Sequence, residues 1–266
     1  MIFRQLFDPE TSSYTYLLAD HVSREAILID PVLEQFDRDR MLLEELGLRL
    51  KYVLETHVHA DHITSSGRLR DALGCQIGVG LAAEVSNADL KLRDGDTVQF
   101  GASSVEVVLT PGHTNGCATY LCREAGMVFT GDALLIRGCG RTDFQEGDAS
   151  VLLRSVREKI FSLPDETFVY PGHDYHGRTV SSVDEEKRFN PRMGLDKSLD
   201  EFIQLMEGLK LAYPKRMDIA VPANLLSGIS ISTSNETLAL GAQNTVAGVM
   251  EESGRQDAEI WMGIGI

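Results

Sequence analysis

Apolar and polar residues alternate along the first part of the chain with the period of two that is typical of β-strands. The predicted strands cover residues 2–7, 14–19, 26–30 and 51–55. Apolar residues at helical spacing predict two helices among them, one that ends at Gly47 and one after His62 that ends at Gly74. Glycine directly after the last periodic residue is a common helix stop. This part of the chain therefore predicts a sheet accompanied by helices.

A second series of strands follows, separated by turns that contain Gly, Pro and Asn. These strands are predicted over residues 96–100, 104–109, 117–122 and 126–130. A helix over residues 149–161 then leads to a strand over residues 167–170. Two batches of strands, each flanked by helices, predict an α/β fold in which two sheets are sandwiched between helices.

The character of the sequence changes near residue 181, where the chain becomes helical and charged. Ser198 is a predicted N-cap residue of a helix, and the residues after Asn224 are rich in Ser, Thr and Gly. We therefore predict a catalytic core over residues 1–180. Residues 181–266 are predicted to be an extension that is helical at first, contributes to the substrate pocket and ends in a tail.

Charge and composition narrow the classes of partner and location. The 266 residues carry a formal net charge of -15, which argues against nucleic acid as a partner. No segment approaches the roughly 18 consecutive apolar residues of a membrane span. The first eight residues lack the long apolar region of a signal peptide. We therefore expect a cytoplasmic protein that has no membrane partner.

The densest chemistry in the chain follows the predicted strand at residues 51–55. Residues 56–62 read Thr-His-Val-His-Ala-Asp-His, which places three imidazoles and one carboxylate within seven residues. Three further motifs follow predicted strands: Pro-Gly-His-Thr with His113, Thr-Gly-Asp with Asp132, and Tyr-Pro-Gly-His with His173. A single histidine is most often an ordinary core or surface residue, but imidazole and carboxylate clusters are typical of metal sites. The sequence therefore predicts a metal site at strand ends.

Seven residues, in this order, carry a resemblance to the metallo-β-lactamase superfamily: His57, His59, Asp61, His62, His113, Asp132 and His173. The resemblance implies an αββα sandwich. The two Pro-Gly-His motifs are similar to those of its glyoxalase II-like branch, which acts on glutathione derivatives. Within that branch, residues 136–145, which read Ile-Arg-Gly-Cys-Gly-Arg-Thr-Asp-Phe-Gln, resemble the persulfide dioxygenases, also called sulfur dioxygenases. Residues 170–175 and 213–224 share this similarity.

The resemblance implies a mononuclear Fe(II) centre, one iron per chain, with His57, His113 and Asp132 as ligands and catalytic residues. Two histidines and one carboxylate leave three coordination positions of iron open, enough for a sulfur ligand and dioxygen together. Zinc has no accessible redox change and would not support such a reaction. The implied reaction converts glutathione persulfide, O2 and water into glutathione and sulfite.

The other motif residues leave a second possibility open. His59, Asp61, His62 and His173 are the residues that would complete a two-metal site, and side-chain chemistry alone would predict two metals. The resemblance implies one iron, with these four residues forming hydrogen bonds to ligands, to substrate or to one another.

Binding of the glutathione carboxylates requires local cations on so acidic a protein. Arg141 is the first candidate because it lies within residues 136–145 and because guanidinium pairs bidentately with carboxylate. Tyr175 is a candidate hydrogen-bond partner of the tripeptide backbone, and Lys215 and Arg216 are candidates for closing the pocket. Each is also explained as a solvated surface residue. For Lys215 and Arg216 this explanation has the same weight as a role in the pocket.

Two other functions stay open at this point. A thiolester hydrolase of the glyoxalase II type would use the same seven ligands to hold two metals that activate water, although the sequence of residues 141–145 argues against it. A non-catalytic sensor of metal or persulfide would report to a partner through its tail. The apolar residues Ile260, Trp261 and Met262 make a homodimer plausible, because symmetric dimers are the commonest oligomers.

Overall fold

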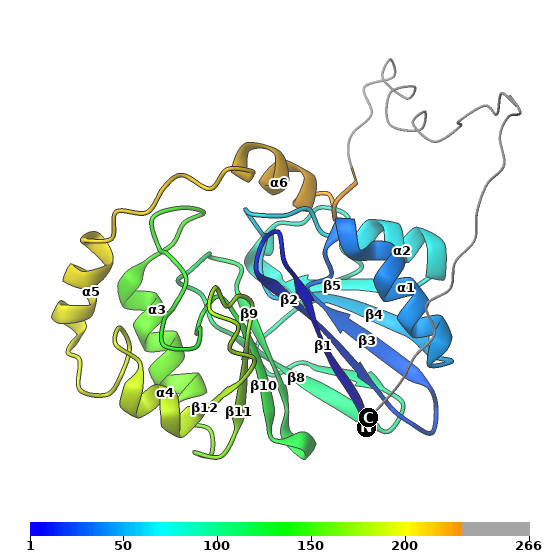
Figure 1. The fold of residues 1–266 in the computed structure, drawn as a ribbon, viewed down its shortest axis with the longest axis horizontal. Coiled ribbons are helices and arrows are strands. Elements are labelled where there is room, and N and C mark those ends of the chain that lie inside the picture. Colours follow the sequence, from blue (N-terminus) through cyan, green and yellow to red (C-terminus); the bar gives the residue numbers. More distant parts are fainter. Residues whose placement is uncertain (230–266) are drawn as a thin grey trace, which may run out of the picture. The chain divides into compact units, whose positions relative to one another are not determined.

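The computed structural model describes residues 1–229, and Met1–Ser230 forms one compact unit (Figure 1). Two six-stranded sheets lie face to face, and helices cover the outer face of each. The predicted α/β sandwich is confirmed. Residues 181–229 belong to the same compact unit as the first 180 residues, so the division at residue 180 stays a prediction about function. Ile260, Trp261 and Met262 lie outside the described residues.

The first sheet has the strand order β1-β2-β3-β4-β5-β6. Its strands are β1 (Ile2–Asp8), β2 (Ser13–Ala19), β3 (Glu25–Ile29), β4 (Arg49–Glu55), β5 (Gln76–Gly80) and β6 (Leu90–Leu92). β1, β2 and β3 pair antiparallel, whereas β3, β4, β5 and β6 run parallel. The carboxyl ends of the parallel strands therefore meet at one edge of the sheet, where ligand sites are common in α/β folds.

The second sheet has the strand order β12-β11-β10-β9-β8-β7. Its strands are β7 (Thr97–Phe100), β8 (Ser103–Leu109), β9 (Ala118–Cys122), β10 (Met127–Gly131), β11 (Phe168–Pro171) and β12 (Ser181–Ser182). β8 and β10 both pair antiparallel with β9, and β11 pairs parallel with β10. The carboxyl ends of β8, β10 and β11 therefore lie at the same edge.

Helices cover the two outer faces (Figure 1). The first sheet is covered by α1 (Phe36–Glu45) and α2 (Ser66–Leu73), and the second by α3 (Ala149–Ser155), α4 (Val183–Phe189) and α5 (Leu199–Glu207). α6 (Met217–Asn224) is the last helix described. Short 3-10 helices occupy Leu33–Gln35, Leu81–Ala83 and Arg123–Ala125, and a π-helical turn, Val156–Ile160, extends α3. Among the described residues, no helix has the length and apolar character needed to cross a bilayer.

Two buried tyrosines tie the sheets together close to their functional edge. The hydroxyl of Tyr16 on β2 donates to the carbonyl of Pro171 at 2.6 Å, and the hydroxyl of Tyr120 on β9 donates to the carbonyl of Glu55 at 2.7 Å. Tyr16 also packs against Phe129, with ring centroids 4.9 Å apart. Since Glu55 and Pro171 end β4 and β11, these bonds fix the strand ends of both sheets relative to each other.

The strands β5 and β6 were not predicted from the sequence. β5 reads Gln-Ile-Gly-Val-Gly, so glycine occupies positions where an apolar side chain would have marked a strand. Gly78 lies against Leu54 on β4, and a Cβ there would approach Leu54 Cδ2 to 2.8 Å. The small residue is therefore a packing requirement of the sheet, and β6 has only three residues, too few to show a period.

Candidate metal centre

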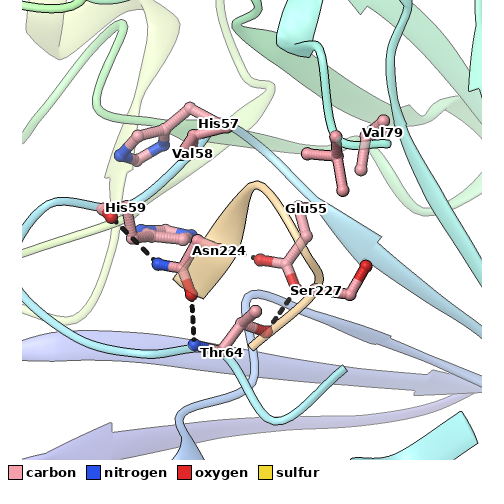
Figure 2. A pocket seen from close by; sticks show the side chains of 9 residues that line it. Glu55, His57, Val58, His59, Thr64, Val79, Asn224 and Ser227 are labelled. Atoms are coloured by element: carbon pink, nitrogen blue, oxygen red, sulfur yellow. Dashed lines mark hydrogen bonds and ion pairs between the residues drawn. The ribbon is translucent and has the colours of Figure 1, made fainter. Parts of the chain in front are cut away.

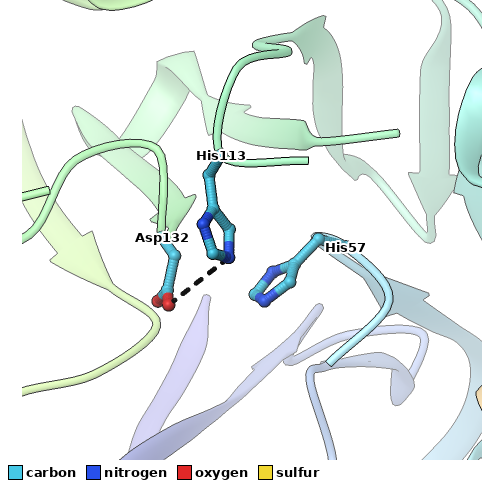
Figure 3. A group of neighbouring side chains, drawn as sticks. All are labelled: His57, His113 and Asp132. Carbon is cyan, nitrogen blue, oxygen red and sulfur yellow. Dashed lines mark ion pairs between the residues drawn. The ribbon is translucent and has the colours of Figure 1, made fainter. Parts of the chain in front are cut away.

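The candidate metal-binding residues lie in loops that leave the carboxyl ends of four strands. β4 leads to His57, β8 to His113, β10 to Asp132 and β11 to His173. Figure 3 shows the side chains of His57, His113 and Asp132 directed toward a common point. One potential ligand atom of each lies within 4.8 Å of the others, a spacing that a single ion can span. The structure thus brings together the three residues that the sequence predicts as ligands.

The orientation of His57 follows from its neighbour Thr56. His57 Nδ1 lies 2.9 Å from Thr56 Oγ1, and that hydroxyl donates its only hydrogen to Asp30 Oδ2 at 2.7 Å. The hydroxyl must therefore accept a hydrogen from Nδ1, which leaves the lone pair of the imidazole on Nε2. Burial, together with the neighbouring imidazoles, lowers the pKa of His57 well below its usual value, so the ring is neutral at neutral pH, as a metal ligand must be.

His113 is oriented by the main chain. Its Nδ1 donates to the backbone carbonyl of Arg141 at 2.6 Å. A carbonyl oxygen only accepts, so the lone pair of His113 lies on Nε2. Gly140 makes this contact possible, because a Cβ at that position would lie 2.6 Å from His113 Nδ1. The Gly-Cys-Gly-Arg sequence therefore positions a ligand through its backbone, a role that its side chains do not indicate.

Asp132 divides its two oxygens between different partners. Oδ1 accepts a hydrogen bond from His173 Nδ1 at 2.7 Å, whereas Oδ2 lies 3.8 Å from His113 Nε2 (Figure 3). Burial alone would raise the pKa of Asp132, but the charge and the hydrogen bond of His173 lower that pKa below its usual range. Asp132 is therefore a carboxylate with one oxygen directed toward the imidazoles of His57 and His113. We call these three residues the triad.

His173 lies between two carboxylates. Besides its bond to Asp132, it donates from Nε2 to Asp61 Oδ2 at 3.0 Å, and His62 Nδ1 donates to the same oxygen at 2.9 Å. Burial would lower the pKa of His173, but the charges of Asp132 and Asp61 raise that pKa well above its usual value. His173 is therefore an imidazolium whose two nitrogens both donate, an arrangement that offers no lone pair to a metal.

His59 faces the other side of the loop. Its Nε2 lies 3.2 Å from Asp30 Oδ1 and 3.4 Å from Glu55 Oε2. Burial would lower the pKa of His59, but the charges of Asp30 and Glu55 raise that pKa to about 10. The motifs in the sequence did not identify Asp30 as a site residue, although it follows β3 as directly as Asp132 follows β10. That repeated pattern, a carboxylate after a buried strand, is the signal that could have found it.

Two further groups of side chains have the spacing of metal ligands, namely His59 with Asp61 and His62, and His59 with Asp30 and Glu55. Both ring nitrogens of His59 and Nε2 of His62 are buried and have no hydrogen-bond partner within residues 1–229. The first group contains three of the four residues that the sequence associates with a second metal.

Arg141 lies beside the centre, but its guanidinium is engaged. It pairs with Asp143, with Nε 2.6 Å from Oδ1 and Nη2 2.7 Å from Oδ2, and it donates from Nη1 to the carbonyl of Ala212 at 2.8 Å. Phe144 and Tyr213 pack edge to face nearby, with ring centroids 5.4 Å apart. These contacts join the loop at residues 141–144 to the segment before α6.

Two of the other predicted substrate-binding residues, Tyr175 and Arg216, differ in their surroundings. Tyr175 is 69% exposed, and its ring stacks parallel to that of His173 with centroids 6.0 Å apart. Arg216 pairs with Glu34 at 2.8 Å between Nη1 and Oε1. Tyr175 therefore lies next to the metal centre with a free outer face, whereas Arg216 connects the start of α6 to the loop before α1.

Comparison with known proteins agrees with this geometry. A family model described as the metallo-beta-lactamase superfamily matches residues 8–173. The mitochondrial persulfide dioxygenase ETHE1 of Bos taurus is 53% identical over 235 residues, which cover 88% of this chain and 91% of that protein. The chain belongs to the persulfide dioxygenase family of the metallo-β-lactamase superfamily. The Homo sapiens persulfide dioxygenase ETHE1, also named mitochondrial, is 52% identical with the same coverage.

The fold of this persulfide dioxygenase family member is matched in a solved structure. Crystalline ETHE1 from Myxococcus xanthus is 55% identical, with a TM-score of 0.83 over 86% of this chain and all 100% of that chain. The resemblance drawn from the motifs is therefore confirmed, and these relatives favour neither the hydrolase nor the sensor. The superfamily and the His and Asp cluster together indicate a metal-binding enzyme. A cytoplasmic location stays a prediction.

Proposed function

We propose that this chain is a persulfide dioxygenase that oxidises glutathione persulfide at one Fe(II) held by His57, His113 and Asp132. The balanced reaction takes glutathione persulfide, O2 and water to glutathione, sulfite and two protons. One observation carries the proposal: two imidazole Nε2 atoms and one carboxylate oxygen converge with free lone pairs in a chain 53% identical to a persulfide dioxygenase. Two histidines and one carboxylate are the donor set of non-haem Fe(II) oxygenases.

The residues around the triad fit this ion. Both imidazoles are held in the Nε2 tautomer by partners on Nδ1, which orients ligands and raises their basicity. The carboxylate of Asp132 supplies one negative charge, which suits a divalent cation. When bound, Fe(II) supplies the redox chemistry that allows dioxygen to react with a sulfur anion.

The contacts of His173 support one iron rather than two. Both of its ring nitrogens donate, to Asp132 Oδ1 and to Asp61 Oδ2, so in this arrangement His173 has no lone pair for a second metal. A cation that already neutralises both carboxylates reduces the electrostatic gain from a second ion. We therefore assign Asp61, His62 and His173 to orientation of Asp132, and His59 to the buried carboxylates Asp30 and Glu55.

Substrate binding is assigned to Arg141, Tyr175 and Arg216. Arg141 is positioned to take a carboxylate of glutathione, provided that its bond to Asp143 is exchanged for one to the substrate. Tyr175 offers an exposed ring and hydroxyl above His173. Arg216 is the more remote candidate, since it pairs with Glu34. Because the net charge is -15, we propose that the protein has no nucleic-acid partner. We also propose that it is a homodimer and that it is located in the cytoplasm.

The test is oxygen uptake by anaerobically purified, Fe(II)-loaded protein after addition of glutathione persulfide. We expect rapid uptake matched by sulfite, one iron per chain, and loss of both iron and uptake in Asp132→Ala. The matched control is Asp165→Ala, which removes an exposed carboxylate that pairs with Lys187. No uptake by the wild-type protein at full iron occupancy would overturn the proposal, and hydrolysis of a glutathione thiolester with two zinc ions per chain would favour the hydrolase.

A further inference from the structure

Asn224, the last residue of α6, is buried against the loop that carries the first metal ligand. Its Nδ2 donates to the carbonyl of His59 at 2.9 Å and to the carbonyl of His62 at 2.8 Å. Its Oδ1 accepts from the backbone amide of Thr64 at 2.9 Å. Figure 2 shows the amide group between His59 and Thr64. One side chain therefore binds three main-chain groups of a loop that precedes it by some 160 residues.

The three partners match the amide group and no other side chain of its size. Two backbone carbonyls require two donors and one backbone amide requires an acceptor, which is the full complement of an asparagine side chain. Aspartate has the same shape but no hydrogen to donate when ionised. Serine offers one donor and is too short, and glutamine is longer by one carbon. The partners also fix which end of the Asn224 amide is nitrogen.

The bonds of Asn224 constrain the turn from which the metal site is built. His59 and His62 lie on either side of Asp61, which holds His173 and through it Asp132. The same turn begins at His57. A cavity of about 10 Å³ lies beside the turn, and His57, His59 and Asn224 are among the residues that line it (Figure 2). Asn224 is therefore one of the side chains that hold this turn, and it alone bonds to the carbonyls of both His59 and His62 among the described residues.

We propose that Asn224 is a positioning residue of the metal centre. By fixing the carbonyls of His59 and His62 and the amide of Thr64, it sets the curvature of the turn. The curvature keeps Asp61 in reach of His173, which in turn holds Asp132. The C-terminal segment is thereby a part of the metal site, although it contributes no ligand. The inference rests on the proposed function only in that the triad binds a metal.

Asn87 provides a matched control, because it holds the same segment without touching the turn. Its Nδ2 donates to the carbonyl of Leu226 at 2.9 Å, and its Oδ1 accepts from Ser227 Oγ at 2.7 Å. If docking of the segment alone mattered, substitution of either asparagine would have the same effect. If the bonds to the turn matter, only Asn224 is sensitive.

The experiment compares wild-type protein with Asn224→Asp and Asn87→Asp under nitrogen and without substrate. The Fe(II) dissociation constant is measured by competition with a chromogenic chelator, and the visible spectrum of the Co(II)-loaded protein reports the ligand geometry. We expect Fe(II) binding at least about tenfold weaker and an altered Co(II) spectrum in Asn224→Asp, as for other residues that orient metal ligands. We expect wild-type values in Asn87→Asp. Asn224→Ala, which introduces no buried charge, serves if Asn224→Asp does not fold.

Two results would overturn the inference: wild-type Fe(II) affinity and Co(II) spectrum in the Asn224 variants, or equal losses in Asn87→Asp. Failure of the proposed function is distinct from either result. A wild-type protein that binds Fe(II) but consumes no oxygen would remove the dioxygenase assignment and leave the comparison of affinities valid. A wild-type protein that binds Co(II) but not Fe(II) would still decide the role of Asn224 through the Co(II) spectrum.

Discussion

His113 donates its Nδ1 hydrogen to the backbone carbonyl of Arg141 at 2.6 Å, so a main-chain atom determines which nitrogen of this imidazole is free to bind a metal. The side chain of Arg141 takes no part in that bond and points to Asp143 instead. Residues 140 and 141 therefore have separable roles. Gly140 leaves room for the imidazole of His113, whereas the guanidinium of Arg141 is the proposed binding group for substrate.

Gly140→Ala is expected to impair the metal site. The new Cβ would lie 2.6 Å from His113 Nδ1 and 2.7 Å from the carbonyl oxygen of Asp132, and both distances are too short for non-bonded atoms. Either the imidazole or the loop must move, so we expect Fe(II) affinity to fall at least about tenfold, with activity falling in parallel. Chelator competition and oxygen uptake measure the two effects.

Gly138→Ala is the control for this prediction. A Cβ at Gly138 would meet only Leu135 Cβ, at 3.8 Å, which is ordinary van der Waals contact. We expect wild-type iron affinity and turnover. Equal losses in the two alanine variants would mean that the loop is merely sensitive to substitution and that the contact of Gly140 with His113 is unimportant.

Arg141→Gln is expected to separate binding from metal retention. Loss of the guanidinium removes a charged hydrogen-bond donor for a glutathione carboxylate, which we expect to raise KM about tenfold. Iron content stays at the wild-type value because the backbone carbonyl still holds His113. Asp143→Asn, which weakens the competing pair, is expected to lower KM. Unchanged KM in both variants would remove Arg141 from the substrate site.

Much of the fold was predictable because the strands of both sheets have clear local signatures. Alternating residues marked β1 and β2, and apolar runs bounded by Gly, Pro and Asn marked β8 to β10. The glycines of β5 hid that strand, since close packing against Leu54 replaced the apolar pattern. The local pattern thus predicted the strands whose own residues alternate or form apolar runs, and it missed a strand that depends on close packing against its neighbour.

The site was predictable to the extent that its residues follow strands. His57, His113, Asp132 and His173 all do, and the structure brings them to one edge. The partners that orient them were not predictable. The bond of His113 to the Arg141 carbonyl and the bonds of Asn224 to the turn join residues 28 and more than 160 positions apart, and a backbone acceptor leaves no trace in the side-chain sequence.

Asp39 gives a prediction of pH dependence that is independent of the metal. This buried residue of α1 accepts from Arg38 Nε at 2.8 Å, and its Oδ2 has no hydrogen-bond partner in the described part of the chain. Burial, opposed by the charge of Arg38, raises the pKa of Asp39 from 3.8 to about 6. A raised pKa in the folded state contributes stability below pH 3.8 that is lost as the pH rises through 6. The full loss in the free energy of unfolding is about 3 kcal/mol.

Asp39→Asn, which stays neutral, removes this dependence. The free energy of unfolding is measured in urea on the metal-free protein. We expect the value for the variant, relative to the wild type, to rise by about 1 kcal/mol between pH 5 and pH 8, because part of the loss in the wild type occurs below pH 5. Lys187→Gln, at an exposed pair with Asp165, serves as a variant whose difference from the wild type stays constant. An equally constant difference in Asp39→Asn would show that Asp39 is ionised throughout this range.

His173→Gln distinguishes a hydrogen-bonding role from a metal-binding one. Glutamine is neutral and cannot bridge Asp132 and Asp61 as the imidazolium does, so the two carboxylates lose their shared cation. We expect Fe(II) affinity to fall about 10- to 100-fold while the capacity stays at one iron per chain. His176→Gln, at an exposed histidine three positions later, is expected to behave as wild type. A wild-type capacity of two metals that drops to one in His173→Gln would instead make His173 a ligand and return the centre to the binuclear type.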